Sequence, residues 1–101
     1  MSHTYRFHVK VQLDFEEAYE WYEDKKAGLG NEFLDAVETK IAEIIANPTY
    51  FGSKGNAKYR EALIDRFPFI IIYILYSKRN EILICAVHNA KKSSKTKYRT
   101  P

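Results

Sequence analysis

The sequence predicts a single α+β domain in which a helical hairpin covers one face of a small antiparallel sheet. Three observations predict it: period-two alternation near the N-terminus, two helix-like segments separated by a glycine turn, and a second half rich in strand-like runs. The predicted element order is therefore β-α-α-β-β-β. A chain of 101 residues has room for one hydrophobic core, so we expect one domain over residues 1–101.

The first predicted strand is a half-buried one near the N-terminus. Apolar and polar side chains alternate from Tyr5 to Leu13, which is the period of a strand with one face in the core. Asp14 then lies three residues before Glu17, a capping-box spacing that predicts a helix beginning at Asp14. Gly28 is expected to end this helix, because glycine tolerates the left-handed conformation of a helix C-cap.

The second predicted helix runs from Asn31, whose side chain can cap it, to the residues before Pro48. Asn47 marks the end, since a residue that precedes proline is disfavoured in helical geometry. One face carries an apolar stripe at helical spacing, made of Phe33, Leu34, Val37, Ile41, Ile44 and Ile45.

The second half predicts three strands and a tail. Residues 58–64 form the first strand, and 67–76 form a central strand that is apolar on both faces. A turn at 77–80 leads into the last strand, 81–88, which completes a hairpin. Residues 91–101 are polar and basic, and we expect them to form a flexible C-terminal tail.

Charge is distributed unevenly along the chain. Residues 14–43 hold ten acids against three lysines, whereas residues 54–101 hold eleven Lys or Arg against three acids. A partner that responds to charge will therefore select one half of the molecule.

Several classes of protein are excluded by composition. The longest apolar run is about ten residues, half of what a bilayer-spanning helix needs, and no apolar signal core follows Met1, so we expect a cytoplasmic protein without membrane contact. Cys85 is the only cysteine and lies in mid-strand, which predicts a buried small hydrophobe rather than a nucleophile. Metal-ligand spacing, a phosphate-binding glycine loop and a serine nucleophile motif are all missing, so neither metal nor cofactor is expected.

Several short motifs follow one another along nearly the whole chain. They are Ala18-Tyr19-Glu20-Trp21-Tyr22-Glu23, Gly28-Leu29-Gly30-Asn31-Glu32-Phe33, Ile45-Ala46-Asn47-Pro48, Arg60, Phe67-Pro68-Phe69 followed by Tyr73, and Val87-His88. This ordered set resembles the RelE/ParE toxin superfamily of bacterial toxin–antitoxin systems, which includes plasmid-stabilisation toxins. The resemblance implies an α+β fold, growth inhibition, and a cognate antitoxin that wraps the toxin and covers its working surface.

The resemblance leaves the target open. RelE-like members cleave mRNA on the ribosome, whereas ParE-like members poison DNA gyrase without catalysing a reaction of their own. Fold does not separate the two activities, so the residues of the site must do so.

Two residues are candidates for catalysis if the chain is a ribonuclease. Metal-free RNA cleavage needs proton-transfer groups and a cation that stabilises the phosphorane. Arg60 can grip a phosphate through its planar guanidinium, and His88 can act as acid or base. The alternatives are a surface ion pair of Arg60 with Glu61 or Asp65, and a strand-capping role for His88.

One departure from the family pattern weakens the ribonuclease interpretation. Ribonuclease members often place a second arginine directly after the aromatic-Pro-aromatic triplet, and Ile70 stands at that position here. Glu61 is not an obvious base, because adjacent residues of a regular strand point to opposite faces and Glu61 should point away from Arg60. Basic and tail residues are candidates for binding phosphate or the target instead: Lys54, Lys58, Lys91, Lys92, Lys95 and Tyr98.

Trp21 is the candidate for antitoxin binding. It lies off the apolar stripe of the first helix, between Glu17 and Lys25, so we expect its indole to be exposed and available to a partner. The alternative for the aromatic residues of this helix is a place in the core. We interpret the chain as a type II toxin and rank a ParE-like gyrase poison ahead of a RelE-like mRNA endoribonuclease. A non-toxic binding module with the same fold is the third alternative.

Overall fold

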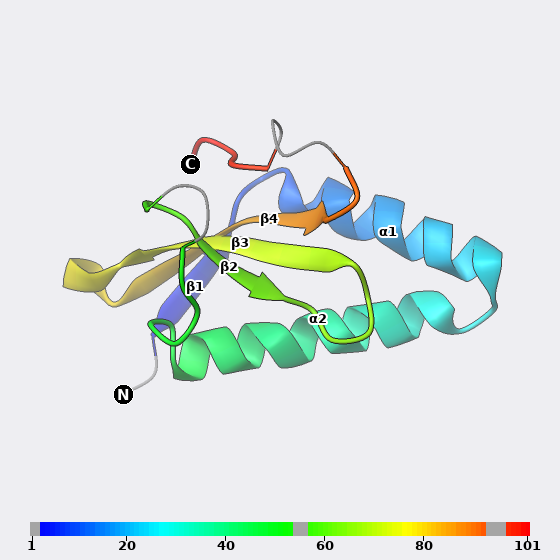
Figure 1. Ribbon diagram of the computed structural model, residues 1–101, viewed down its shortest axis with the longest axis horizontal. Helices are drawn as coiled ribbons and strands as arrows, with labels where there is room; N and C mark the ends of the chain where they lie inside the picture. The colour runs from blue at the N-terminus through cyan, green and yellow to red at the C-terminus, as the bar shows by residue number, and fades with distance from the viewer. Residues whose placement is uncertain (1–2, 54–56, 93–96) are drawn as a thin grey trace.

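The computed structural model describes residues 3–53, 57–92 and 97–101. The predicted order β-α-α-β-β-β is confirmed, with two helices followed by a strand-rich half (Figure 1). The elements are β1 (Thr4–Phe7), α1 (Val11–Lys25), α2 (Leu29–Ala46), β2 (Arg60–Leu63), β3 (Phe69–Tyr76), the 3-10 turn η1 (Ser77–Arg79) and β4 (Glu81–Asn89).

The four strands form one sheet in the order β1-β4-β3-β2. β2, β3 and β4 pair in antiparallel fashion, as predicted, but β1 pairs with β4 in parallel fashion, so the sheet is mixed. The chain leaves β1 through the helical hairpin and returns to the sheet at its opposite edge. Parallel neighbours require such a long crossover connection, and β4 then runs alongside β1 in the same direction.

The first strand is shorter than predicted, because α1 begins at Val11 where alternation predicted strand up to Leu13. Val11 is 1% exposed and lies on the same helix face as Ala18 and Tyr22, whereas Val9 and Leu13 are 87% and 56% exposed. A helix therefore buries Val11 with the core while it leaves its two apolar neighbours in solvent. Tertiary packing overrides the period-two pattern here.

Neither predicted helix cap is observed. Lys10 precedes α1, and Asp14 lies inside the first turn, where its Oδ2 accepts a 2.9 Å hydrogen bond from the backbone N–H of Val87. α2 begins at Leu29 after Gly28, so Asn31 lies within the helix. Gly28 has φ of 91°, the left-handed conformation expected of it.

Glu23 holds the turn between the helices. Its carboxylate accepts hydrogen bonds from the backbone N–H groups of Gly28 and Gly30, at 2.9 and 3.0 Å. A Cβ atom at Gly30 would lie 2.7 Å from the ring of Tyr19, so the hairpin closes only because this residue has no side chain. A long acidic side chain thus performs the capping role that sequence reasoning gave to Asn31.

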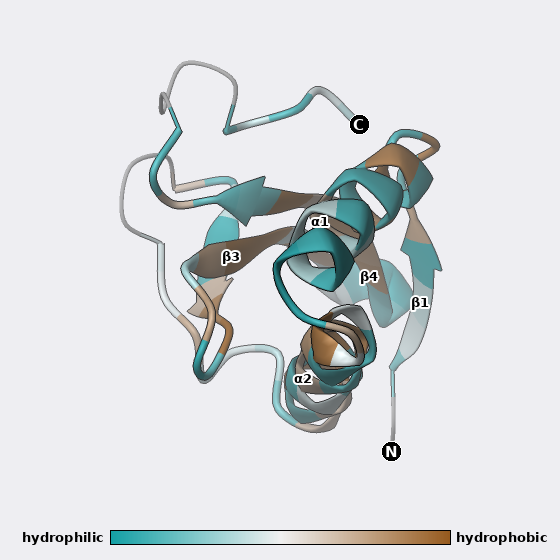
Figure 2. Cartoon of the chain, turned by 90° about the vertical axis from the view of Figure 1, so that its right-hand side faces the viewer, coloured by the Kyte–Doolittle hydropathy of each residue, from teal (hydrophilic) through white to brown (hydrophobic). Residues whose placement is uncertain are grey.

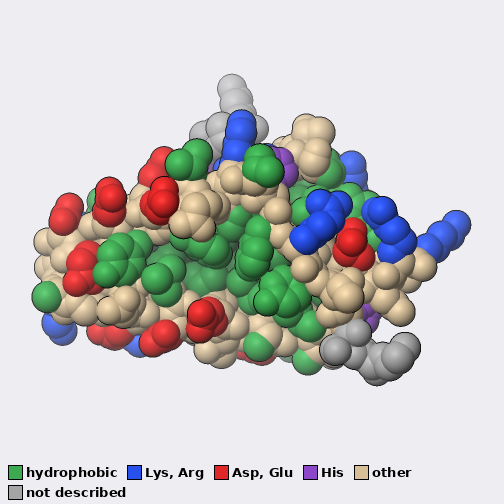
Figure 3. Space-filling view, turned by 180° about the vertical axis from the view of Figure 1, so that it is seen from behind, with side chains coloured by type: hydrophobic (Ala, Val, Ile, Leu, Met, Phe, Trp, Pro, Cys, Tyr) green, Lys and Arg blue, Asp and Glu red, His purple; other side chains and the backbone are tan. Residues whose placement is uncertain are grey.

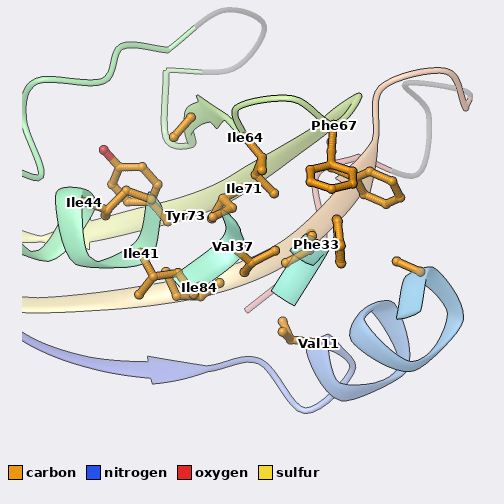
Figure 4. Packing of buried hydrophobic residues seen from close by; sticks show 14 of the residues in the cluster. Val11, Phe33, Val37, Ile41, Ile44, Ile64, Phe67, Ile71, Tyr73 and Ile84 are labelled. Atoms are coloured by element: carbon orange, nitrogen blue, oxygen red, sulfur yellow. The ribbon is translucent and has the colours of Figure 1, made fainter. Parts of the chain in front are cut away.

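The core lies between the helices and one face of the sheet, and we call this face the inner face (Figures 2 and 4). Phe33 is fully buried, and its ring centroid lies 5.3 Å from that of Tyr22 and 4.9 Å from that of Phe69. Tyr73 is also fully buried, and its hydroxyl donates a 2.6 Å hydrogen bond to the carbonyl of Pro48. Burial raises the pKa of Tyr73 to about 12, so the phenol remains a donor and anchors the end of α2.

The described end of the chain, residues 97–101, lies on the opposite side of the sheet from α2 (Figures 1 and 2). Arg99 forms two 3.0 Å hydrogen bonds with the carboxylate of Asp14, and its Nη1 donates to the carbonyl of Cys85. This part of the predicted tail is therefore bound to the domain. Flexibility of the tail is a statement about motion, which these contacts do not test, so it stays a prediction.

Candidate functional site

Strand register assigns the predicted site residues to two faces of the sheet. Residues paired directly across strands place their side chains on the same face. Arg60 pairs with Tyr73, whose side chain lies in the core beneath the helices. His88 pairs with Ile70, which packs on the opposite face. We call this second face, which carries Glu61, Ile70, Ile72, Cys85 and His88, the outer face.

Arg60 binds the loop that follows α2. Its Nη1 donates hydrogen bonds to the carbonyl oxygens of Phe51 at 2.7 Å and Thr49 at 3.4 Å. The ion pairs of Arg60 with Glu61 or Asp65 are not observed in the described residues. Glu61 belongs to the outer face, and the carboxylate of Asp65 lies 3.7 Å from the ammonium of Lys40. A guanidinium engaged by backbone carbonyls has fewer donors left for a phosphate.

His88 lies half-buried at the end of β4 on the outer face. Burial lowers the pKa of His88, and the charge of Lys97 lowers it further, while the carboxylate of Asp14 acts in the opposite direction. The imidazole is therefore held neutral more firmly than a free histidine. Arg60 and His88, which sequence reasoning placed in one catalytic site, lie on opposite faces of the sheet and are not brought together.

Glu61 was not predicted to act as a base, because it should point away from Arg60. Its side chain is only 2% exposed, and its Oε1 lies 2.7 Å from the ammonium of Lys97. The hydroxyl of Tyr98 donates a hydrogen bond to its Oε2. Alternation along β2 already predicted that Glu61 would point away from Arg60, and the same alternation places it on the face of His88.

A cleft of about 570 Å³ opens between α1, the end of β4 and Arg99, and we call it the end cleft. Lys91 and Lys92 are exposed and line it together with His88. Trp21 lines it from α1; its side chain is 57% exposed, as predicted, and the ammonium of Lys25 lies 4.6 Å from the ring centroid. The end cleft thus combines an aromatic surface with cations, and the carboxylates of Asp14 and Glu17 also line it.

The remaining predicted binding residues are dispersed. Lys58 is exposed, and its ammonium lies 5.8 Å from the ring centroid of Tyr59. The ring of Tyr98 packs against the same ring, with centroids 5.0 Å apart and planes tilted by 34°. Lys54 and Lys95 lie outside the described residues.

An apolar groove of about 550 Å³ lies on the helical side, between β1, the start of α1 and α2 (Figure 3). We call it the rear groove. Tyr5 and Phe7 of the edge strand β1 are 49% and 43% exposed beside it. Its lining is almost entirely apolar and comprises Tyr5, Phe7, Phe15, Leu34, Val37, Glu38, Ile41, Ala42 and Ile45.

Within residues 3–53, 57–92 and 97–101, His, Cys, Asp and Glu side chains form no group of three that could hold a metal ion. Both described helices are too polar or too short to cross a membrane.

Known proteins resemble this chain in structure rather than in sequence. No protein-family model and no curated protein sequence matches it. The toxin–antitoxin structure of the chromosomal ParDE system from P. aeruginosa matches with a TM-score of 0.76 at 12% identity, over 88% of this chain and 97% of that chain. The isolated E. coli RelE toxin matches with a TM-score of 0.66 at 11% identity, over 94% of this chain and 92% of that chain.

A further match is a mutant of the E. coli toxin RelE in complex with a peptide of its antitoxin, with a TM-score of 0.67 at 12% identity, over 96% of this chain and 92% of that chain. ParDE and RelE structures thus share one arrangement of two helices and four strands with this protein. The chain has the fold of the RelE/ParE toxin superfamily.

Proposed function

We propose that this protein is the toxin of a type II toxin–antitoxin module, that it acts in the cytoplasm, and that it inhibits growth by binding its target. The observation that carries the proposal is the fold, which covers 97% of the matched ParDE chain and leaves little of either chain unaccounted for. The matched RelE structures include complexes with an antitoxin, which supports an antitoxin as partner.

The rear groove supports antitoxin binding on physical grounds. Its rim exposes Tyr5 and Phe7 of β1, whose outer edge is unpaired within the described sheet. An amphipathic segment can bury these rings, and an extended one can add backbone hydrogen bonds to β1. Trp21 offers a second aromatic contact on the other side of α1 and stays a prediction as an antitoxin contact.

Among possible targets, the site favours a ParE-like gyrase poison over a nuclease. Arg60 is engaged by the carbonyls of Thr49 and Phe51, and Ile70 occupies the position where nucleases often have arginine. Glu61 is buried under Lys97 and Tyr98, so this carboxylate of the outer face is covered and is not open to act as a base beside His88. Binding through the basic residues of the end cleft requires neither group.

The decisive experiment measures DNA supercoiling by purified gyrase with and without excess toxin. Accumulation of cleaved gyrase–DNA complexes supports the proposal, and normal supercoiling at saturating toxin refutes the gyrase target. The isolated toxin mixed with its antitoxin should leave supercoiling unchanged, which serves as the control.

Ribosome-dependent mRNA cleavage is the second candidate, and one observation favours it. Glu61, His88 and Tyr98 share the outer face, so an acid, an imidazole and a phenol lie on one surface. A map of RNA 5′ ends after brief induction distinguishes the two, because cleavage produces new ends phased to codons. Normal growth with neither effect would identify the third alternative, a non-toxic binding module.

A further inference from the structure

Three consecutive residues near the C-terminus each contact a carboxylate, either on the outer face or on the adjoining helix α1. The ammonium of Lys97 lies 2.7 Å from Glu61 Oε1, and the Tyr98 hydroxyl donates to Glu61 Oε2. Arg99 donates from Nη1 to Asp14 Oδ2 and from Nη2 to Asp14 Oδ1, both at 3.0 Å. A cation and an aromatic residue thus share the carboxylate of Glu61, and a second cation is bound by the carboxylate of Asp14. We call residues 97–99 the strap.

The outer face and the adjoining start of α1 provide the acids for these contacts. Glu61 and Asp14 have side chains only 2% and 15% exposed, and a buried carboxylate without a partner is costly. The ring of Tyr59 packs against that of Tyr98 with centroids 5.0 Å apart and the ring planes tilted by 34°. Apolar neighbours complete the surface around these groups: Ile70, Ile72, Ile74, Leu83, Cys85 and Ala86.

Backbone groups add to the recognition. The Tyr59 hydroxyl donates a 2.9 Å hydrogen bond to the carbonyl of Arg99, and Arg99 donates to the carbonyl of Cys85. The hydrogen bond with Glu61 also raises the pKa of Lys97 and so favours its charged form. By contrast, Lys91 and Lys92, in the same basic segment, are exposed to solvent.

We propose that the outer face is a binding site for a cation–aromatic–cation peptide, and that the strap occupies it as a tethered ligand which a partner polypeptide of the same chemistry can replace. The directional, charge-assisted bonds of this site suit exchange between two ligands that offer the same donors. While the strap is bound, Glu61 is covered and the cations of the strap are engaged. This proposal is independent of toxicity and of the identity of the target.

The direct test supplies the strap as a separate peptide. In the full chain, Lys97→Ala, Tyr98→Ala and Arg99→Ala are combined to empty the site, and a fluorescent peptide of residues 91–101 is titrated against it by anisotropy. Saturable binding is expected, and a peptide with alanine at 97–99 should bind at least about tenfold more weakly, as loss of a charge-assisted hydrogen bond implies. Equal binding of the two peptides, or none to the folded variant, would overturn the proposal.

Cys85 provides a second measurement that needs no peptide. It is the only cysteine, it is fully buried on the outer face, and burial raises its pKa to about 11. Alkylation therefore reports opening of this face. Tyr98→Phe keeps the ring and removes only the bond to Glu61, so this milder variant should be labelled faster than the parent chain and Lys78→Ala should not. Equal rates in all three folded proteins would contradict a releasable strap.

Discussion

The two faces of the sheet are covered in different ways. Helices cover the inner face with large apolar side chains, and Phe33, Ile71 and Tyr73 there are completely buried. The outer face is covered at Glu61 and Cys85 by the strap, through ion pairs and hydrogen bonds. Apolar burial is non-directional and proportional to area, whereas charge-assisted bonds depend on particular partners. The cover of the inner face therefore depends on packed area, and the cover of the outer face depends on individual pairs of groups.

This difference also separates the predicted catalytic residues. Arg60 belongs to the inner side, where it holds the loop after α2, and His88 belongs to the outer face. Mutation of Arg60 should therefore affect the inner side of the sheet, and mutation of His88 should affect the outer face. Mutations on the two faces should therefore have separable effects on stability.

Phe33→Ala should produce the largest loss of stability. Phe33 is fully buried among Tyr22, Phe67 and Phe69, so truncation removes apolar contacts and leaves a cavity. We expect the free energy of unfolding to fall by about 3–5 kcal/mol in urea denaturation. Phe33→Leu should lose clearly less, because most of the volume is kept; equal losses would mean that cavity formation is not the cause.

Arg60→Ala should destabilise the protein by about 1–3 kcal/mol, the range for losing hydrogen bonds from a charged donor. The carbonyls of Phe51 and Thr49 lose their donor, so hydrogen exchange should rise in the loop after α2. Lys78→Ala, a change at an exposed turn residue, is the matched control and should stay within about 0.5 kcal/mol of the parent chain. Unchanged stability and exchange in Arg60→Ala would leave the arginine available for phosphate.

His88 should make stability depend on pH. Because burial and Lys97 lower its pKa below the ordinary value of 6.5, the unfolded chain binds this proton more readily than the folded one. The contribution is complete above about pH 6.5 and is lost as pH falls through the lower folded-state pKa. Unfolding free energies measured from about pH 7.5 to 5 should decrease more steeply in the parent chain than in His88→Gln. Parallel profiles would show that another group is responsible.

Leu63→Ala should have the smallest effect. Leu63 lies on the outer face of the edge strand β2 and is 60% exposed, beyond the part covered by the strap. We expect its unfolding free energy to change by no more than about 0.5 kcal/mol. A loss comparable with that of Phe33→Ala would mean that a partner or a second copy covers this end of the outer face.

Much of the framework could be predicted from the sequence. The apolar stripe from Phe33 to Ile44 identified the buried face of α2, and the apolar run that ends at Tyr76 identified the central strand. The exposure of Trp21 was predicted correctly from its place on the helical wheel. These features depend on local periodicity, which a sequence displays directly.

Other features required the tertiary structure. The alternating pattern did not predict that the first strand ends at Phe7. Val11 is buried in either a strand or a helix, and only the packing of the domain selects the helix. Asp14 has the spacing of a helix cap, yet it binds Val87 and Arg99, which are far away in sequence.

Side-chain periodicity is sufficient to predict the order of elements, the helix faces and the central strand, because each of these follows from a few neighbouring residues. The folded domain was needed to show that Arg60 and His88 lie on opposite faces and that Glu61 contacts Lys97 and Tyr98. These relations depend on strand register and on a contact between residues 37 positions apart. Such long-range pairing is fixed by the packing of the whole domain, so it cannot be predicted from a local sequence pattern.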